Sequence, residues 1–316
     1  MPRLRSGLAT LLTLCLLALF AQGCSINRMV TKAAAGALTK GPDVFSSDDD
    51  PELVEDAIPF GLKTYESFLA ALPEDPDLLL ACTRGFTQYA VGFVGLAADT
   101  LGPDHFDEAQ AGRARALRLL LRARNYGLRG LELRHKGLTA ALATRPDSAA
   151  ATIGREQLPM LYWTAAAWGS AIGYGKDRPD LLGDIDAVRA LMKRALTLDD
   201  TYEGGQLHEA GIVLEALPRE MGGSLERAKQ HFDRAIELSH DQDPAPYVTW
   251  AQSVSIPQQD RAEFTRMLDK ALSFDPDAVP SKRLLTILMQ RKAHALLARA
   301  DDLFLAPPDA QPQEKP

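Results

Sequence analysis

Residues 221–239 read MGGSLERAKQHFDRAIELS. Ser224 is a typical helix N-cap, and the glycine pair before it can adopt the positive φ that ends a preceding helix. Ala228, Phe232 and Ala235 follow at spacings of four and three, which places them on one face of a helix. The small residues let a second helix approach while the phenylalanine fills the groove between the two. The stretch therefore predicts a helix that packs closely against a neighbouring helix.

The same A-x3-F-x2-A spacing is that of the second helix of a tetratricopeptide repeat. Ala271 followed by Pro276, and Ala71 followed by Pro76, give the Ala-to-terminal-Pro spacing of that repeat, whereas Ala195 is followed at that spacing by Asp200. No strict period of about 34 residues runs through the chain. The sequence thus predicts degenerate repeats, with irregular all-helical packing as the alternative.

Helical patterns extend over most of the remaining chain. There is no sustained alternation of Val, Ile and Thr bounded by hairpin turns, so strands are not expected. Pro and Gly clusters divide the region, and short connections between helices favour antiparallel neighbours. We therefore predict an all-α fold, a tetratricopeptide-like α-solenoid of helical hairpins over 47–305. Its expected helices are 52–72, 77–101, 104–124, 126–143, 155–174, 179–198, 203–217, 224–239, 244–255, 258–273 and 280–305.

The N-terminal stretch Met1–Cys24, MPRLRSGLATLLTLCLLALFAQGC, has two arginines followed by a short apolar run. The run is too short to span a bilayer and predicts a secretory signal peptide over 1–23. Its ending, Ala21-Gln22-Gly23-Cys24, resembles a bacterial lipobox, so Cys24 is the predicted lipid attachment site. An ordinary signal peptide cleaved nearby is the alternative. Residues 24–46 are then expected to form a lipid-anchored tether, and 306–316 a disordered tail.

Composition limits the possible partners. The formal net charge is −7, which argues against nucleic acid as a partner and against docking on anionic lipid, so membrane contact is expected only through the lipid. Of the three cysteines, Cys15 lies in the signal and Cys24 at the lipid site. Only Cys82 is left, as a small buried hydrophobe, so the processed chain cannot form an internal disulfide.

Motifs for catalysis or cofactor binding are not recognised. The Asp48-Asp49-Asp50 run could bind a metal, but Asp50 before Pro51 favours a helix start. The six histidines are dispersed without metal-ligand spacing, and the sequence around Lys176 departs from a phosphate loop at two of its defining positions. The glycine pair before Ser224 could touch a ligand, although helix termination explains it better. We expect no cofactor, no metal and no enzymatic activity; an unrecognised hydrolase is the remaining enzymatic alternative.

The stretch 158–174, LPMLYWTAAAWGSAIGY, is the most unusual part of the body, because aromatic residues flank a run of small ones. Most simply these rings belong to the core. Alternatively, some of them line an apolar cavity, which helical solenoids form on their concave side. The candidate ligand-binding residues are Tyr89, Tyr162, Trp163, Trp168 and Tyr174.

Four segments together resemble the TatT family, the lipoprotein T-component associated with tripartite ATP-independent periplasmic (TRAP) transporters. They are SSDDDPELVEDAIPFGLKTYESFLAALPEDPDLLLACTRGFTQYA at 46–90, LYWTAAAWGSAI at 161–172, the opening stretch at 221–239, and KAHALLARADDLF at 292–304. The resemblance implies a periplasmic, lipid-anchored protein with cryptic tetratricopeptide repeats that forms homotrimers. It also implies association with the TRAP substrate-binding component and an apolar pore for a small hydrophobic ligand.

Two functions of different classes follow. The first is an accessory protein of TRAP-type uptake that holds or relays a small hydrophobic ligand. The second is a tetratricopeptide adaptor in cell-envelope assembly that binds only proteins. Ser25 directly after Cys24 predicts lipid anchoring at the periplasmic face of the outer membrane, because an aspartate there would favour retention in the inner membrane.

Overall fold

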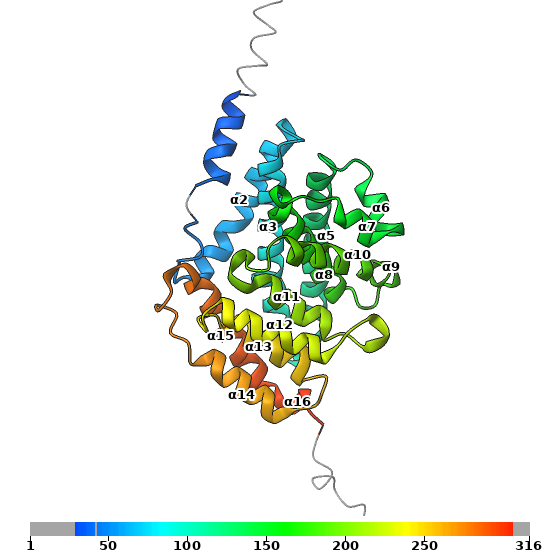
Figure 1. The fold of residues 1–316 in the computed structure, drawn as a ribbon. Coiled ribbons are helices and arrows are strands. Elements are labelled where there is room, and N and C mark those ends of the chain that lie inside the picture. Colours follow the sequence, from blue (N-terminus) through cyan, green and yellow to red (C-terminus); the bar gives the residue numbers. More distant parts are fainter. Residues whose placement is uncertain (1–28, 42, 306–316) are drawn as a thin grey trace, which may run out of the picture.

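The computed structural model describes residues 29–41 and 43–305, and these contain helices, turns and loops but no β-strand. The predicted all-α class is confirmed. The predicted signal peptide, Cys24 and the tail 306–316 lie outside the described residues. Figure 1 shows how the helices are arranged. The α-helices are α2 (Pro51–Ala71), α3 (Pro76–Tyr89), α4 (Leu96–Thr100), α5 (Phe106–Glu132), α6 (Leu138–Thr144), α7 (Pro146–Ala151), α8 (Leu158–Tyr174), α9 (Pro179–Leu182), α10 (Ile185–Leu198), α11 (Gln206–Glu215), α12 (Leu225–Leu238), α13 (Ala245–Trp250), α14 (Arg261–Leu272), α15 (Arg283–Ala298) and α16 (Ala300–Leu303).

Helix starts follow the capping residues in the sequence. Asp50 accepts a hydrogen bond from the backbone N–H of Leu53 at 2.9 Å, at the start of α2. Ser224 accepts one from the N–H of Arg227 at 3.3 Å, at the start of α12. Gly222 has φ of 83°, the left-handed conformation that glycine adopts without strain. The acidic run and the glycine pair therefore have the structural roles expected of helix ends.

The repeat pattern is only partly reflected in the packing. Ala228, Phe232 and Ala235 are buried on α12, which packs against α11, and Ala271 of α14 is also buried. Ala71 at the end of α2 is exposed, so its spacing to a proline does not mark a packed position. The alanine pattern identifies helix contacts in the C-terminal half better than at the N-terminus.

Some expected helix boundaries are wrong, including that of 179–198, which is divided into α9 and α10. The sequence predicted separate helices at 104–124 and 126–143, whereas α5 continues to Glu132. Two glycines of α5 lie where it crosses α8 closely. A Cβ atom on Gly127 would lie 2.2 Å from Oγ1 of Thr164, and one on Gly130 would lie 2.3 Å from Cε of Met160. At Gly127 the helices are too close for any larger residue without a shift, whereas at Gly130 the flexible end of Met160 could move aside.

Part of the expected tether is also folded. Residues 29–39 are helical, and Ala35 within them is 3% exposed. The hydroxyl of Tyr65 donates to the backbone oxygen of Leu38 at 3.3 Å, and Lys40 forms an ion pair with Asp77 at 2.9 Å. Alanine-rich sequence has high helix propensity, and contact with α2 and α3 stabilises it here. Any flexible linker is therefore shorter than 24–46.

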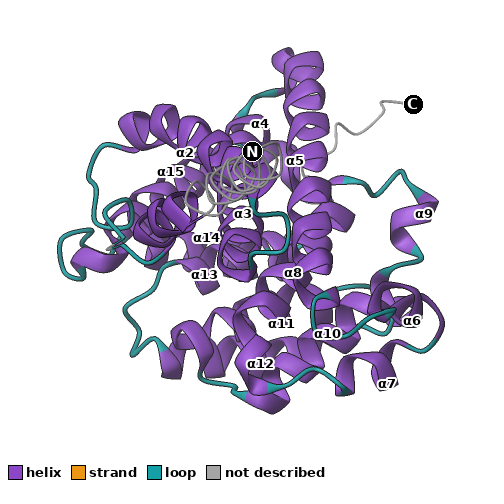
Figure 2. Ribbon diagram, turned by 90° about the horizontal axis from the view of Figure 1, so that it is seen from above, coloured by secondary structure: helices purple, strands orange, loops and turns teal. Residues whose placement is uncertain are grey.

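The ends of the body meet. Consecutive helices pack against one another along the chain, and α15 returns to contact α2 and α4 (Figure 1). The backbone N–H of Leu284 donates to the oxygen of Ser46 at 3.1 Å, and Arg291 pairs with both carboxylate oxygens of Glu52 at 2.6 and 3.2 Å. Viewed from above, α3 lies between α2 and α5 (Figure 2). The succession of helices thus closes on itself.

Candidate functional site

A large cavity lies within the closed arrangement of helices. Its volume is about 2170 Å³, well above the range of about 300–1000 Å³ typical of a site for one small ligand. The lining comes from α2, α3, α4, α5, α8, α9, α10, α11, α12, α13 and α15 and from the loops between them. Exposed residues such as Asp177 and Glu226 contribute to it, so the cavity opens to solvent.

Two non-α segments lie in the cavity wall. Residues Ala90–Gly95 and Ala251–Ser255 form π-helical turns, η1 and η6. Val91, Gly92 and Phe93 of η1 line the cavity, as does Ser253 of η6. π-Helical turns inside α-helices are uncommon and frequently occur at functional sites. Their position here supports a functional role for the cavity.

The aromatic helix α8 contributes three of the five predicted ligand residues to the lining: Tyr162, Trp163 and Tyr174. The hydroxyl of Tyr162 donates to Gln206 at 3.2 Å, and the ring of Trp163 meets the Tyr162 ring edge to face at 5.0 Å. The hydroxyl of Tyr174 donates to Asp99 at 3.1 Å. Burial raises the pKa of both tyrosines, which therefore stay neutral and present apolar rings with satisfied hydroxyls.

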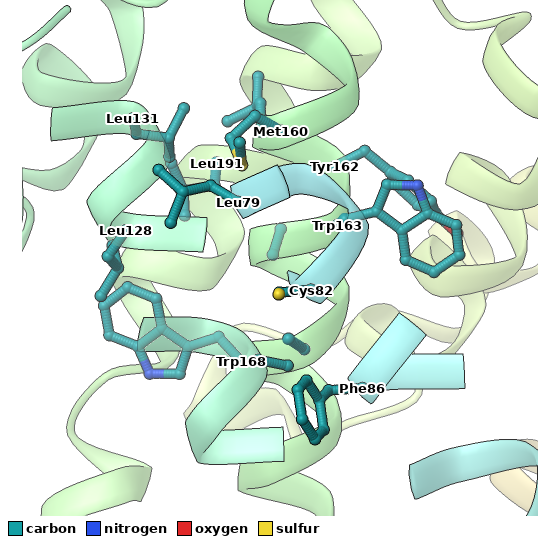
Figure 3. Packing of buried hydrophobic residues seen from close by; sticks show 14 of the residues in the cluster. Leu79, Cys82, Phe86, Leu128, Leu131, Met160, Tyr162, Trp163, Trp168 and Leu191 are labelled. Carbon is teal, nitrogen blue, oxygen red and sulfur yellow. The ribbon is translucent and has the colours of Figure 1, made fainter. Parts of the chain in front are cut away.

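The other two predicted residues, Trp168 and Tyr89, are absent from the lining. Trp168 is 5% exposed and packs under Arg124, with its indole N–H donating to Asp184 at 3.0 Å. Tyr89 is buried as well, and its hydroxyl accepts a hydrogen bond from Arg115 at 3.2 Å. In Figure 3 the rings of Trp163 and Trp168 lie on opposite sides of Cys82. The structure does not bring these five residues to one site.

A polar group lies near Tyr162 in the cavity lining. Glu209 of α11 lines the cavity and accepts a hydrogen bond from the hydroxyl of Thr249 at 2.9 Å. Desolvation and the nearby Asp243 raise the pKa of Glu209 to about 7. Asp243 itself is paired with Lys282 at 2.9 Å. A carboxyl group with a pKa near neutrality, inside a mostly apolar cavity, can change its charge under physiological conditions.

Helix α15 supplies a second charged group. Leu284, Leu285, Leu288 and Met289 line the cavity, and Lys292 lines it one turn further along. Burial lowers the pKa of Lys292. Within residues 29–41 and 43–305, this ammonium has no ion pair or hydrogen bond. Sequence reasoning missed both Glu209 and Lys292, since each is a single charge on an amphipathic helix.

Other candidate chemistry is not supported in the described residues. They contain no cluster of three or more His, Cys, Asp or Glu side chains suited to a metal ion. Cys82 is fully buried, and desolvation raises the pKa of its thiol to about 12, so it is an inert part of the core as expected. Gly223 and Ser224 line the cavity, which leaves Gly223 open to contact with a ligand as well.

Among the described helices, α8 included, none combines the length and the hydropathy that crossing a bilayer requires.

Comparison with known proteins identifies the family. A family model described as TRAP transporter T-component matches residues 47–304, nearly the whole described body. A protein of Treponema pallidum (strain Nichols), named only as an uncharacterized protein, is 30% identical over 306 residues, which cover 91% of this chain and 95% of that protein. Both matches agree with the resemblance in the four segments of sequence. The chain belongs to the TRAP transporter T-component family.

Proposed function

We propose that this T-component holds or relays a small, largely apolar ligand in its central cavity, as an accessory protein of a TRAP-type uptake system. The observation that carries the proposal is the cavity of about 2170 Å³ within the closed helices, walled by Trp163 and the small residues of α8. Ala165, Ala166 and Gly169 in that wall keep the space open where larger side chains would fill it.

The partner we propose is the substrate-binding component of the TRAP system. Family membership supports this, because a T-component is named for its place in such a system. We also propose that the body is a homotrimer anchored through a lipid on Cys24 at the periplasmic face of the outer membrane. The alanine substitution Cys24→Ala should then release the protein from the membrane fraction, and continued membrane association would contradict the anchor.

Capture from membranes tests the partner. The tagged full chain, extracted from its native membrane, should recover the TRAP substrate-binding component. A strain that lacks that component, with the same tagged chain, is the control for non-specific capture. Recovery of envelope-assembly proteins alone would overturn the proposal and favour the tetratricopeptide adaptor. The large, mostly apolar cavity favours the first function, since an adaptor for proteins alone does not need such a space.

A further inference from the structure

One wall of the cavity is amphipathic along its length. Leu285, Leu288 and Met289 of α15 face the cavity, and Lys292 follows on the same face. At 1.5 Å per residue, Leu285 and Lys292 are separated by about 10 Å along the helix axis. A ligand lying along this wall would meet an apolar surface of that length and then a positive charge.

The charge of Lys292 is not compensated by the protein. Asp99 and Glu209 act on it electrostatically, but neither lies within ion-pair distance among the described residues. Lys282, on the segment just before α15, is different, because it pairs with Asp243 at 2.9 Å. Removing the ammonium of Lys292 from water without an ion-pair partner costs free energy, and the lowered pKa of Lys292 reflects this cost. A bound anion would remove that cost.

The surroundings also limit the charge of the anion. Glu209 lines the same cavity, and its pKa of about 7 means that it carries a negative charge for part of the time at neutral pH. A dianion such as a phosphate monoester would be repelled more strongly by Glu209 than a monoanion, and beside the apolar residues of α15 it would meet the ammonium of Lys292 alone. A monoanion is compensated by Lys292 alone, and protonated Glu209 could donate a hydrogen bond to it.

We propose that the cavity takes an amphiphilic carboxylate, with its apolar chain along Leu285, Leu288 and Met289 and its carboxylate at the ammonium of Lys292. This inference rests on the proposed function, which requires a ligand in the cavity, and adds the class of that ligand. The ligand is then not purely hydrophobic but carries one anionic group at its end.

The test compares dodecanoate with its methyl ester, which has the same chain but no charge. The full chain is titrated with each probe, and binding is followed by isothermal titration calorimetry. Wild type should bind the acid at least tenfold more tightly than the ester, as expected for a charge-assisted hydrogen bond in a desolvated site. Lys292→Met should abolish this preference and leave binding of the ester unchanged.

Lys176→Met is the matched control, because Lys176 also lines the cavity but is exposed to solvent. It should keep the wild-type preference. Thermal unfolding of both variants shows that they are folded, and Lys292→Met removes a partly buried charge that is unpaired among the described residues, so its melting temperature should not fall. Equal affinity of wild type for acid and ester would overturn the carboxylate site and leave the proposed function standing. Binding of neither probe would overturn the proposed function itself.

Discussion

Two faces of α8 carry a tryptophan each, and they differ in what surrounds the ring. Trp168 packs under the guanidinium of Arg124 and donates to Asp184, on the side that is filled with protein. Trp163 is nearly as buried, at 8% exposed, but lies at the wall of the cavity. The exposed fraction of a side chain therefore does not distinguish a packed ring from one that borders an internal space.

The difference has a structural origin. On the packed side, Gly127 and Gly130 bring α5 so close to α8 that a methyl group would not fit. On the cavity side, a Cβ atom on Gly173 would meet nothing within 4 Å. Small residues thus serve two purposes on one helix: close packing on one face and preservation of open space on the other.

The largest expected effect is on the packed face. Trp168→Ala should lower the free energy of unfolding by about 3–5 kcal/mol, because it removes a large buried ring and leaves the carboxylate of Asp184 without its indole donor. Urea denaturation measures the loss. Val213→Ala is the control in the cavity wall, where the exposed side chain should cost under about 0.5 kcal/mol. A loss under 1 kcal/mol at Trp168 would show that its surroundings are not tightly packed.

Replacing Gly127 and Gly173 by alanine should change the free energy of unfolding in opposite directions. Gly127→Ala forces a methyl group against Thr164 and should destabilise the fold by about 2 kcal/mol. Gly173→Ala adds a methyl group in open space within a helix and should stabilise it by about 0.5–1 kcal/mol. Denaturant midpoints of the two variants check this pair. The same sign for both changes would contradict the contrast between the faces.

The smallest effect concerns Glu209 and depends on pH. Its folded-state pKa of about 7 exceeds the ordinary 4.5, so the folded protein holds this proton more tightly than the unfolded chain. The contribution of protonated Glu209 to the free energy of unfolding is fully present below pH 4.5 and is lost as the pH rises to about 7. Asp243 opposes its ionisation, whereas Lys282 and Lys292 favour it.

Glu209→Gln should therefore raise the melting temperature at pH 8 and have little effect at pH 4.5. Thermal unfolding at both pH values measures the difference. Glu226→Gln, at the exposed rim of the cavity, is the matched control, and its effect on the melting temperature should be the same at both pH values. If Glu209→Gln changed stability equally at both pH values, Glu209 would not be the desolvated group that the cavity geometry describes.

Much of the fold was predictable, because capping residues and helical periodicity act locally. Asp50 and Ser224 cap the predicted helices, and the spacing of Ala228 and Phe232 marked a buried face correctly. The continuous α5 was missed, because the sequence was divided at residue 125, where the helix in fact continues to Glu132.

The cavity was less predictable. Tyr162, Trp163 and Tyr174 were expected ligand residues and do line it, whereas Trp168 does not, because a half-turn of helix separates packed from open surroundings. Lys292 gave no signal at all. Its environment depends on contacts between α15 and helices far away in the sequence, and no local pattern records them.

Single-tryptophan proteins test the central claim, that Trp163 borders a ligand cavity and Trp168 does not. Trp168 and Trp250 are replaced by Phe in one variant, and Trp163 and Trp250 in the other. Each is titrated with ω-bromoundecanoate, whose bromine quenches indole emission on contact. The account predicts saturable quenching when only Trp163 remains and none when only Trp168 remains. Equal quenching of both, or quenching of Trp168 alone, would contradict it.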